Sequence, residues 1–207
     1  PQYPIAVLGI TADRLAEIGP SRNRIRTIPN GIDVEQIQNA PLPEQGYDVL
    51  FAGRLTKHKN VDQLLEAFDA VAADHDATLG IIGDGPERKR LEAKPRTLTH
   101  ANRVKFPGFL DDYEDVLGHM RAADVFASPS TREGFGITYA EAIAAGCTVI
   151  GVDHPDSAAD EVIGDAGFIV EPTVDALTKT FEAALCGYRP SSDSVERAQR
   201  YDWDAVE

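Results

Sequence analysis

The chain has 207 residues, of which 43% are hydrophobic, which is enough for one large domain or two small ones with a sizeable core. Its 34 acidic residues outnumber its 20 basic residues, so its formal net charge is −14. A surface of this charge repels nucleic acid, and no nucleic-acid partner is expected.

The first part of the chain mixes helical, extended and loop signals. Residues 5–18 favour a helix that ends before a Gly-Pro pair. Residues 24–28 alternate polar and apolar side chains, which predicts a short strand, and the Pro-Asn-Gly sequence at 29–31 is typical of a turn. Residues 40–46 are predicted to be a loop before a more regular region.

From residue 48 onward, apolar strands alternate with helices. The predicted strands are 48–52, 78–82, 104–106, 124–127, 148–151 and 168–170. The predicted helices are 61–73, 87–93, 112–121, 137–145, 174–186 and 193–201. This alternation predicts an α/β fold, with a parallel sheet covered by helices on both faces.

Glycine-containing loops follow four of these strands, at 53, 83–85, 108 and 134–136. Parallel strands end at one edge of the sheet, where such folds bind ligands, so these loops are expected to share one rim. Glycine lets a phosphate approach the main chain, and the N-terminus of a following helix attracts an anion. For the glycines at 83 and 85 a tight turn before the helix is the alternative, and Phe109 can equally belong to the core.

The rim also carries a cationic segment, from Gly53 through Arg54 to Lys59. In a protein with this excess of acids, a diphosphate needs local cations. Arg offers a planar fork to phosphate oxygens, and Lys offers a compact charge. In a sugar-nucleotide transferase both would neutralise the departing diphosphate. The alternative is a solvated basic loop that caps the next helix.

Two carboxylates bracket the last glycine loop. Glu141 lies in a helix that otherwise reads as buried, so its carboxylate needs a partner, which a ribose diol would supply. Glu133 can accept a sugar hydroxyl or face positive charge that develops at an anomeric carbon. The alternative for the pair is a buried ion pair with Arg121 or Arg132.

Other features restrict the compartment and the cofactors. No run approaches ~18 apolar residues, and the first residues lack the pattern of a signal peptide. Two cysteines, Cys147 and Cys186, favour a reducing cytoplasm over a disulfide framework. The histidines show no metal-ligand spacing and no GxGxxG follows a strand, so neither a metal nor a nicotinamide cofactor is expected. The acidic surface suits a high-salt cytoplasm, with an acidic mesophilic protein as the alternative, and the missing initiator Met suggests a fragment.

Several motifs carry a resemblance to a known family. In chain order they are Ile28-Pro29-Asn30-Gly31-Ile32-Asp33, Gly53-Arg54-Leu55 with Lys59 and Leu64-Leu65, Gly83-Asp84-Gly85-Pro86, Val104-Lys105-Phe106-Pro107-Gly108-Phe109, and Pro129-Ser130 through Glu133-Gly134-Phe135-Gly136 to Glu141-Ala142. On these motifs, over about residues 20–190, the chain resembles the C-terminal half of a retaining GT-B-fold glycosyltransferase of the glycosyltransferase family 4 type. The last motif matches the family's E-x7-E pattern.

The resemblance implies a domain organisation. Residues 1–22 would be the end of an interdomain linker with an N-terminal helix, and residues 23–200 a Rossmann-like domain that binds a nucleotide sugar. Residues 201–207 would begin a truncated C-terminal crossover helix. Acceptor binding and further catalytic groups would come from a missing N-terminal domain, so the fragment alone is expected to bind donor without appreciable transfer.

The resemblance also implies roles for individual residues. Arg54 and Lys59 would bind the donor diphosphate, Glu133 would contact the donor sugar near the reacting centre, and Glu141 would bind the ribose. Arg54, Lys59 and Glu133 are the expected catalytic residues. The remaining donor-site residues, including those of the phosphate-binding backbone and those near the base, would be Gly53, Gly83, Gly85, Phe109, Leu110, Gly134, Phe135, Gly136 and Ile137.

The implied activity is transfer of a hexosyl group from a UDP-, GDP- or ADP-sugar to a glycan, a lipid or a small acceptor. The nucleotide sugar is a substrate, so no cofactor is expected, and the full-length protein would be cytoplasmic or peripheral at the inner membrane face. The alternatives are a GT-B-like sugar-nucleotide epimerase and a non-catalytic scaffold, although intact Arg54, Lys59, Glu133 and Glu141 argue against the scaffold.

The sequence departs from the family pattern at three places. The usual Lys-Gly is Lys59-Asn60, and the usual Pro is absent from the stretch 146–149. The common Gly-Gly before the next Glu is replaced by residues 153–157, which leaves open the path of the loop that leads to Glu161.

Overall fold

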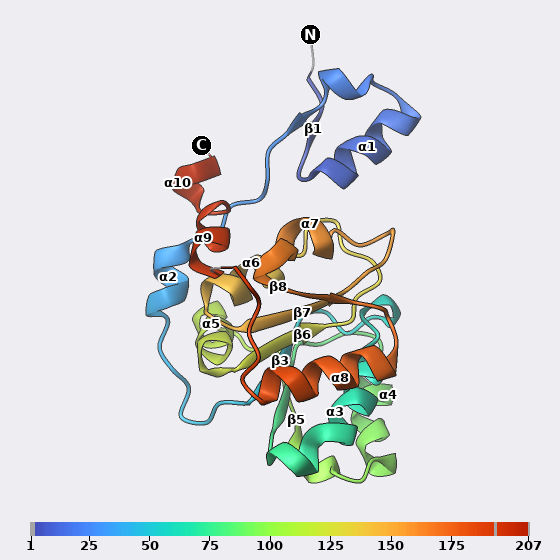
Figure 1. The fold of residues 1–207 in the computed structure, drawn as a ribbon, viewed down its shortest axis with the longest axis vertical. Helices are drawn as coiled ribbons and strands as arrows, with labels where there is room; N and C mark the ends of the chain where they lie inside the picture. The colour runs from blue at the N-terminus through green and yellow to red at the C-terminus, as the bar shows by residue number, and fades with distance from the viewer. Residues whose placement is uncertain (1–2, 193, 207) are drawn as a thin grey trace.

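The computed structural model describes residues 3–192 and 194–206. Its main body is a six-stranded, all-parallel sheet with the strand order β5-β4-β3-β6-β7-β8 (Figure 1). The strands are β3 (Val49–Ala52), β4 (Leu79–Ile82), β5 (Val104–Gly108), β6 (Val125–Ser128), β7 (Thr148–Val152) and β8 (Gly167–Val170). The predicted α/β fold with a Rossmann-like parallel sheet is confirmed.

Helices cover both faces of the sheet. On one face lie α3 (Val61–His75), α4 (Arg88–Ala93) and α8 (Val174–Leu185), and α3 packs beside α8 (Figure 1). On the other face lie α2 (Val34–Asn39), α5 (Tyr113–Ala122), α6 (Ile137–Ala144), α7 (Ala159–Ile163) and α9 (Ser194–Gln199). Because both faces are covered, the central strands are apolar throughout, and every residue of β3, β4, β6 and β7 is buried.

The strand order fixes where a ligand can bind. The first strand of this sheet along the chain, β3, lies in its middle. The chain then adds β4 and β5 on one side of β3 and returns to add β6, β7 and β8 on the other side. Connections therefore leave the neighbouring strands β3 and β6 in opposite directions. In open parallel sheets a crevice forms at this point, outside the carboxyl ends of the strands.

A small N-terminal unit lies apart from this sheet, beyond α7 (Figure 1). It consists of β1 (Ile5–Ala6), α1 (Gly9–Ile18), a 3-10 turn (Arg22–Arg24) and β2 (Arg26–Thr27). The prediction of one helix over 5–18 was wrong at its start, since β1 pairs in parallel with β2 and the helix begins only at Gly9. The reason is tertiary: the amides of Arg26 and Ile28 donate to carbonyls in the segment 4–6, which holds that segment extended.

The remaining differences concern short elements. The helices α2 and α7 were not predicted and have six and five residues, and α2 is fixed by a capping bond from the Gln36 amide to the Asp33 carboxylate, 2.7 Å long. A four-residue helix, α10 (Trp203–Val206), lies within the stretch 201–207, where a helix was expected to begin. The predicted helix at 193–201 corresponds to α9, and its first residue, Asp193, lies outside the described residues, as do residues 1–2 and 207. Within the described part of the chain, no helix has both the length and the apolar character needed to cross a membrane.

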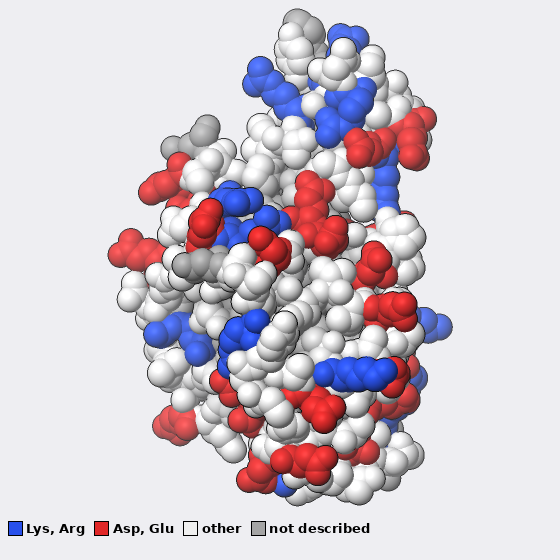
Figure 2. All heavy atoms as spheres, in the orientation of Figure 1, with Lys and Arg blue, Asp and Glu red and all other residues white. Residues whose placement is uncertain are grey.

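Acidic side chains are distributed widely over the surface. On the face shown in Figure 2 they lie on the main body and on the N-terminal unit, with Lys and Arg side chains between them. Most of the ion pairs in the described part of the chain join partly or largely exposed side chains, such as the pair of Lys179 with Asp175 on α8. Exposed pairs of this kind contribute little to stability.

Candidate nucleotide-binding site

A cavity of about 450 Å³ lies at the carboxyl ends of β3, β4 and β5. It is lined by Ala52, Gly53 and Arg54 after β3, by Ile82, Gly83 and Asp84 after β4, by Phe109, Leu110 and Asp111 after β5, and by Tyr113, Val116 and Thr138 from α5 and α6. Its volume lies within the range of small-molecule sites, which is about 300–1,000 Å³. The predicted rim residues Gly53, Arg54, Gly83, Phe109 and Leu110 are thus brought together.

Two of the rim glycines are required by the close packing of the loops around them. A Cβ on Gly83 would lie 2.0 Å from the carbonyl oxygen of Gly53, and a Cβ on Gly85 would lie 2.4 Å from that of Leu55. The loops are joined by a hydrogen bond from the Leu55 amide to the Asp84 carbonyl, 2.9 Å long. Close packing of the two loops therefore accounts for these glycines without a ligand.

The loops that follow β3 and β6 are also joined. The Thr131 amide donates to the His58 carbonyl at 2.9 Å, and the side-chain amide of Asn60 donates to the Pro129 carbonyl at 3.0 Å. Asn60 has a φ of +48°, in the left-handed region. Among residues other than glycine, Asn is one of those that tolerate this region best. Asn60 can therefore adopt the backbone conformation at a position where the family that the sequence resembles usually has Gly.

Across these joined loops, Lys59 and Glu133 form an ion pair between Nζ and Oε1. Their side chains are only 15% and 12% exposed, so the pair is largely withdrawn from water. It connects residues 74 positions apart in the sequence. Glu133 therefore pairs with Lys59, and the alternative ion pair with Arg121 or Arg132 is wrong, since Arg121 donates instead to the Ala40 carbonyl.

Arg54 is the cation that faces the cavity. It is exposed, and within the described part of the chain its side chain forms no hydrogen bond or ion pair. Lys59 is already matched by Glu133. Among the residues that line the cavity, Arg54 therefore supplies the positive charge available to an anion. Lys59 follows further along the same loop.

The loop from Glu133 to α6 is anchored by its backbone. The Glu133 amide donates to the Asp156 carbonyl and its carbonyl accepts from the Ala158 amide, both at 3.1 Å. Gly136 has a φ of +80° and a Cβ there would lie 2.6 Å from the Tyr139 ring. Gly134 is different, because no atom of the described residues, apart from Gly134 and its two chain neighbours, lies within 4 Å of the position that its Cβ would take.

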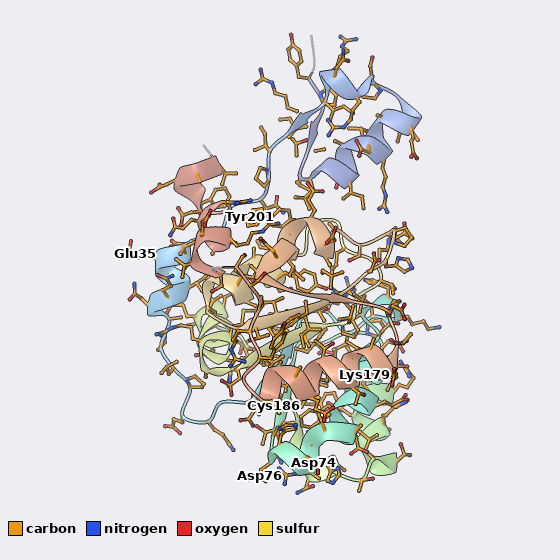
Figure 3. The ribbon with its side chains drawn as sticks, in the orientation of Figure 1. Glu35, Asp74, Asp76, Lys179, Cys186 and Tyr201 are labelled. Atoms are coloured by element: carbon orange, nitrogen blue, oxygen red, sulfur yellow. The ribbon has the colours of Figure 1, made fainter. Side chains whose placement is uncertain are left out.

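The two hydrophobic residues of this loop differ in environment. Phe135 is buried, and its ring packs edge-on against Tyr201, with centroids 5.5 Å apart (Tyr201 is labelled in Figure 3). Its side chain belongs to the core, so only its backbone is available to a ligand. Ile137 is exposed and begins α6.

Glu141 is buried, with 5% of its surface exposed, as predicted from its helix. The hydroxyl of Tyr113 donates a hydrogen bond to its Oε2 atom, 2.7 Å long. Burial raises the pKa of the Glu141 carboxyl to about 7, and the hydrogen bond from Tyr113 opposes this increase. No Lys or Arg of the described residues forms an ion pair with Glu141, so the alternative pair with Arg121 or Arg132 is wrong for this residue too.

Sequence reasoning missed several residues of the site. Tyr113, Thr138, Asp84 and Asp111 line the cavity but were not candidates. Thr138 could have been found, because it lies one helical turn before Glu141. No spacing connects Tyr113 with Glu141. The alternative that Phe109 belongs to the core is wrong, since 71% of its surface is exposed.

The N-terminal unit contacts the edge of this site. The amides of Gly9 and Ile10, at the start of α1, donate to the two carboxylate oxygens of Glu161 at 2.7 and 3.1 Å. The Thr11 hydroxyl donates to the carbonyl of Gly134 at 3.3 Å. The loop that leads to Glu161, whose path the sequence left open, thus joins the Glu133 loop to α1.

Comparisons with known proteins agree with this geometry. A family model described as "Glycosyl transferases group 1" matches residues 33–201. The phosphatidyl-myo-inositol mannosyltransferase of Mycolicibacterium smegmatis is 35% identical over 194 residues, which cover 86% of this chain and 48% of that protein. The 2-deoxystreptamine glucosyltransferase of Streptomyces kanamyceticus is 31% identical over 147 residues, which cover 65% of this chain and 38% of that protein.

Among solved structures, Anabaena HepE in complex with UDP and glucose superimposes with a TM-score of 0.82 at 22% identity, over 98% of this chain and 60% of that one. At this identity the match speaks for the fold alone. The chain spans about half the length, or less, of the curated relatives described above.

Proposed function

The chain belongs to the glycosyl transferases group 1 family, and from this premise we propose that it forms the donor-binding half of a retaining glycosyltransferase. The donor is a nucleoside diphosphate sugar, and the group transferred is a hexosyl residue. The nucleotide occupies the cavity at the ends of β3, β4 and β5. Transfer is to a glycan, a lipid or a small acceptor.

The observation that carries this proposal is the cavity-facing charge of Arg54, whose side chain has no partner among the described residues, in a protein with a net charge of −14. An anionic ligand is repelled by the surface as a whole, so it needs a local cation. The guanidinium fork of Arg54 suits the oxygens of a diphosphate. When the bond between the anomeric carbon and the diphosphate breaks, its electron pair leaves with the diphosphate, and Arg54 and Lys59 stabilise the charge that accumulates there.

The two carboxylates have different roles in this proposal. Glu133 lies against Lys59, beside the open space at Gly134, where it can accept a hydroxyl of the donor sugar. The amides at the start of α6, from Gly134 to Ile137, complete the phosphate site. Glu141, buried in the same helix, accepts from the ribose.

The proposal assigns acceptor binding to a part of the protein outside this chain. This is supported by the two relatives, of whose length the matched segment covers only 48% and 38%. We therefore expect the chain to bind the donor nucleotide but not to transfer its sugar at an appreciable rate. HepE, which shares this fold, was solved with UDP and glucose, so a nucleoside diphosphate and a sugar are ligands that a protein of this fold can hold.

Isothermal titration calorimetry tests the proposal. UDP, GDP and ADP are titrated separately into the wild-type chain, and at least one is expected to bind. Arg54→Ala and Lys59→Ala are each expected to weaken that binding by about tenfold or more, because each removes a charge-assisted contact. The control is Lys179→Ala, since Lys179 is an exposed cation on α8, on the opposite face of the sheet from α6 (Figure 3).

Two results would contradict the proposal. Absence of binding by all three nucleotides at about millimolar concentration would exclude a donor site. Affinities of the Arg54 and Lys59 variants equal to that of the Lys179 variant would instead indicate a domain that has kept only the fold.

A further inference from the structure

Tyr113 stands between the cavity and the buried carboxylate of Glu141. The Tyr113 side chain lines the cavity, whereas Glu141 does not. The tyrosine hydroxyl reaches past the cavity wall to Oε2 of Glu141, at 2.7 Å. A ligand in the cavity therefore meets the tyrosine before it meets the carboxylate.

The two side chains differ in their exposure to solvent. Glu141 is 5% exposed and lies in the middle of α6, among buried neighbours. Tyr113 is 52% exposed and is the first residue of α5. The start of α5 is fixed by Asp112, whose carboxylate accepts from the Glu114 amide at 3.0 Å. The Asp112 cap does not involve the tyrosine side chain, so rotation of that side chain toward solvent would leave the start of α5 in place.

We propose that Tyr113 is an exchangeable cap on Glu141, which occupies the place of a ribose hydroxyl in the free protein and gives it up when the donor nucleotide binds. This inference rests on the proposed function, because it takes the ligand of Glu141 to be the ribose of a nucleoside diphosphate. In both states the carboxylate keeps a hydroxyl donor. Tyr113 is therefore a positioning residue, whose contact is made in the free protein and lost in the complex.

The physical reason for such a cap is the desolvation free energy of a buried carboxylate. An unpartnered carboxylate in this position would lose its hydration without compensation. The tyrosine hydroxyl offsets that cost while the site is empty. A ligand that binds Glu141 through its ribose must then displace the tyrosine, so the cap weakens the binding of ligands that carry ribose hydroxyls and reduces their advantage over ligands that lack them.

The test is a cycle of two proteins and two ligands, measured by calorimetry at pH 8. The proteins are the wild type and Tyr113→Phe, which removes only the hydroxyl, and thermal melting checks that the variant is folded. The ligands are whichever of UDP, GDP and ADP the wild type binds most tightly, and its 2′,3′-dideoxy counterpart. The matched control is Tyr188→Phe, since Tyr188 is an exposed tyrosine whose ring stacks on Phe168.

The expected result is specific to the hydroxyl. Tyr113→Phe should bind the natural nucleotide about fivefold more tightly than the wild type, because one net hydrogen bond no longer has to be displaced. Its affinity for the dideoxy nucleotide should equal that of the wild type, since that ligand offers no hydroxyl in exchange. Tyr188→Phe should match the wild type with both ligands.

Three results would overturn the proposal. Weaker or unchanged binding of the natural nucleotide by Tyr113→Phe would show that the tyrosine stays in the complex or plays no part in binding. An equal gain for both ligands would show that the effect does not involve the ribose. Both of these leave the proposed function standing, whereas a wild type that binds none of the three nucleotides overturns the cap and the proposed function together.

Discussion

At the scale of single residues, the site is a set of charges held in different ways. Among the described residues, the Arg54 side chain has no hydrogen-bond or ion-pair partner, Lys59 is paired with Glu133, and the Glu141 carboxylate accepts only from the hydroxyl of Tyr113. A neutral donor stabilises a buried carboxylate less than a cation does. Glu141 is therefore the residue of the site whose ionisation should most affect the stability of the fold.

This leads to a prediction for Glu141→Gln. The pKa of Glu141 is about 7 in the folded chain, against a usual value of 4.5. Between these pH values the folded state retains a proton that the unfolded state has lost, so stability falls as the pH rises from 4.5 to 7. The glutamine variant does not titrate, and it should be more stable than the wild type at pH 8, by an amount on the order of 3 kcal/mol at most.

Urea denaturation at pH 8 and at pH 4.5 measures this difference. The advantage of Glu141→Gln should be greatest at pH 8 and should shrink as the pH falls, because both proteins are then neutral at this position. Glu182→Gln, at an exposed carboxylate of α8, serves as the control and should show no such dependence. A difference that is equal at the two pH values would contradict a raised pKa for Glu141.

At the scale of elements, the glycines of the rim loops separate into those that packing requires and those that it does not. Gly83 has a φ of +132° and sits against the Gly53 carbonyl. Gly134 has neither constraint. The two positions look alike in the sequence, since each follows a strand of the same sheet, and only the path of the neighbouring loop distinguishes them.

Substitution by alanine should reveal this difference. Gly83→Ala is expected to lower the free energy of unfolding by about 2–4 kcal/mol, because it adds backbone strain to a steric clash. Gly134→Ala should leave that free energy within about 0.5 kcal/mol of the wild type, while it weakens nucleoside diphosphate binding. Chemical denaturation and calorimetry give the two quantities. A Gly134→Ala variant that binds nucleotide as the wild type does would remove Gly134 from the proposed phosphate site.

The sequence predicts the main sheet well because its signals there are local. An apolar run such as 79–82 forms a strand, and a segment with one apolar face such as 61–75 forms a helix, in any fold that buries these side chains. The strand at 5–6 was missed because its partner lies about twenty residues further on. The short helices α2 and α7 were missed because packing against the core, rather than their own length, holds them in place.

The site was predictable as a rim but not as a set of contacts. The strand ends placed Arg54, Gly83 and Phe109 together, because parallel strands share one edge. The contacts of Lys59 with Glu133 and of Tyr113 with Glu141 join different loops and helices. Their formation depends on side-chain directions that spacing does not encode. The roles of these residues in binding and catalysis stay predictions.

At the scale of the whole molecule, polar contacts hold the N-terminal unit against the main body. Glu161 of α7 receives two amides from the start of α1, and Arg14 pairs with Asp156 at 2.8 Å. The unit has its own small core of Ala6, Ala12 and Ile25. Since that core is separate, the unit can loosen from the main body without unfolding the sheet.

The interpretation that the acidic surface is adapted to high salt stays a prediction.

Glu161→Ala should loosen the N-terminal unit selectively. The first amides of an α-helix have no partner within the helix, so the Glu161 carboxylate is what protects those of Gly9 and Ile10 from exchange. A charge-assisted hydrogen bond is worth about 1.5–3 kcal/mol, so hydrogen exchange at these two amides should accelerate by about tenfold or more. Exchange in β3 and β6 should stay unchanged, because these strands are buried in the separate main core. Asp160→Ala, which removes the neighbouring exposed carboxylate of the same helix, is the matched control. Equal acceleration in both variants would mean that the charge of α7 as a whole, rather than the cap that Glu161 places on α1, holds the unit in place.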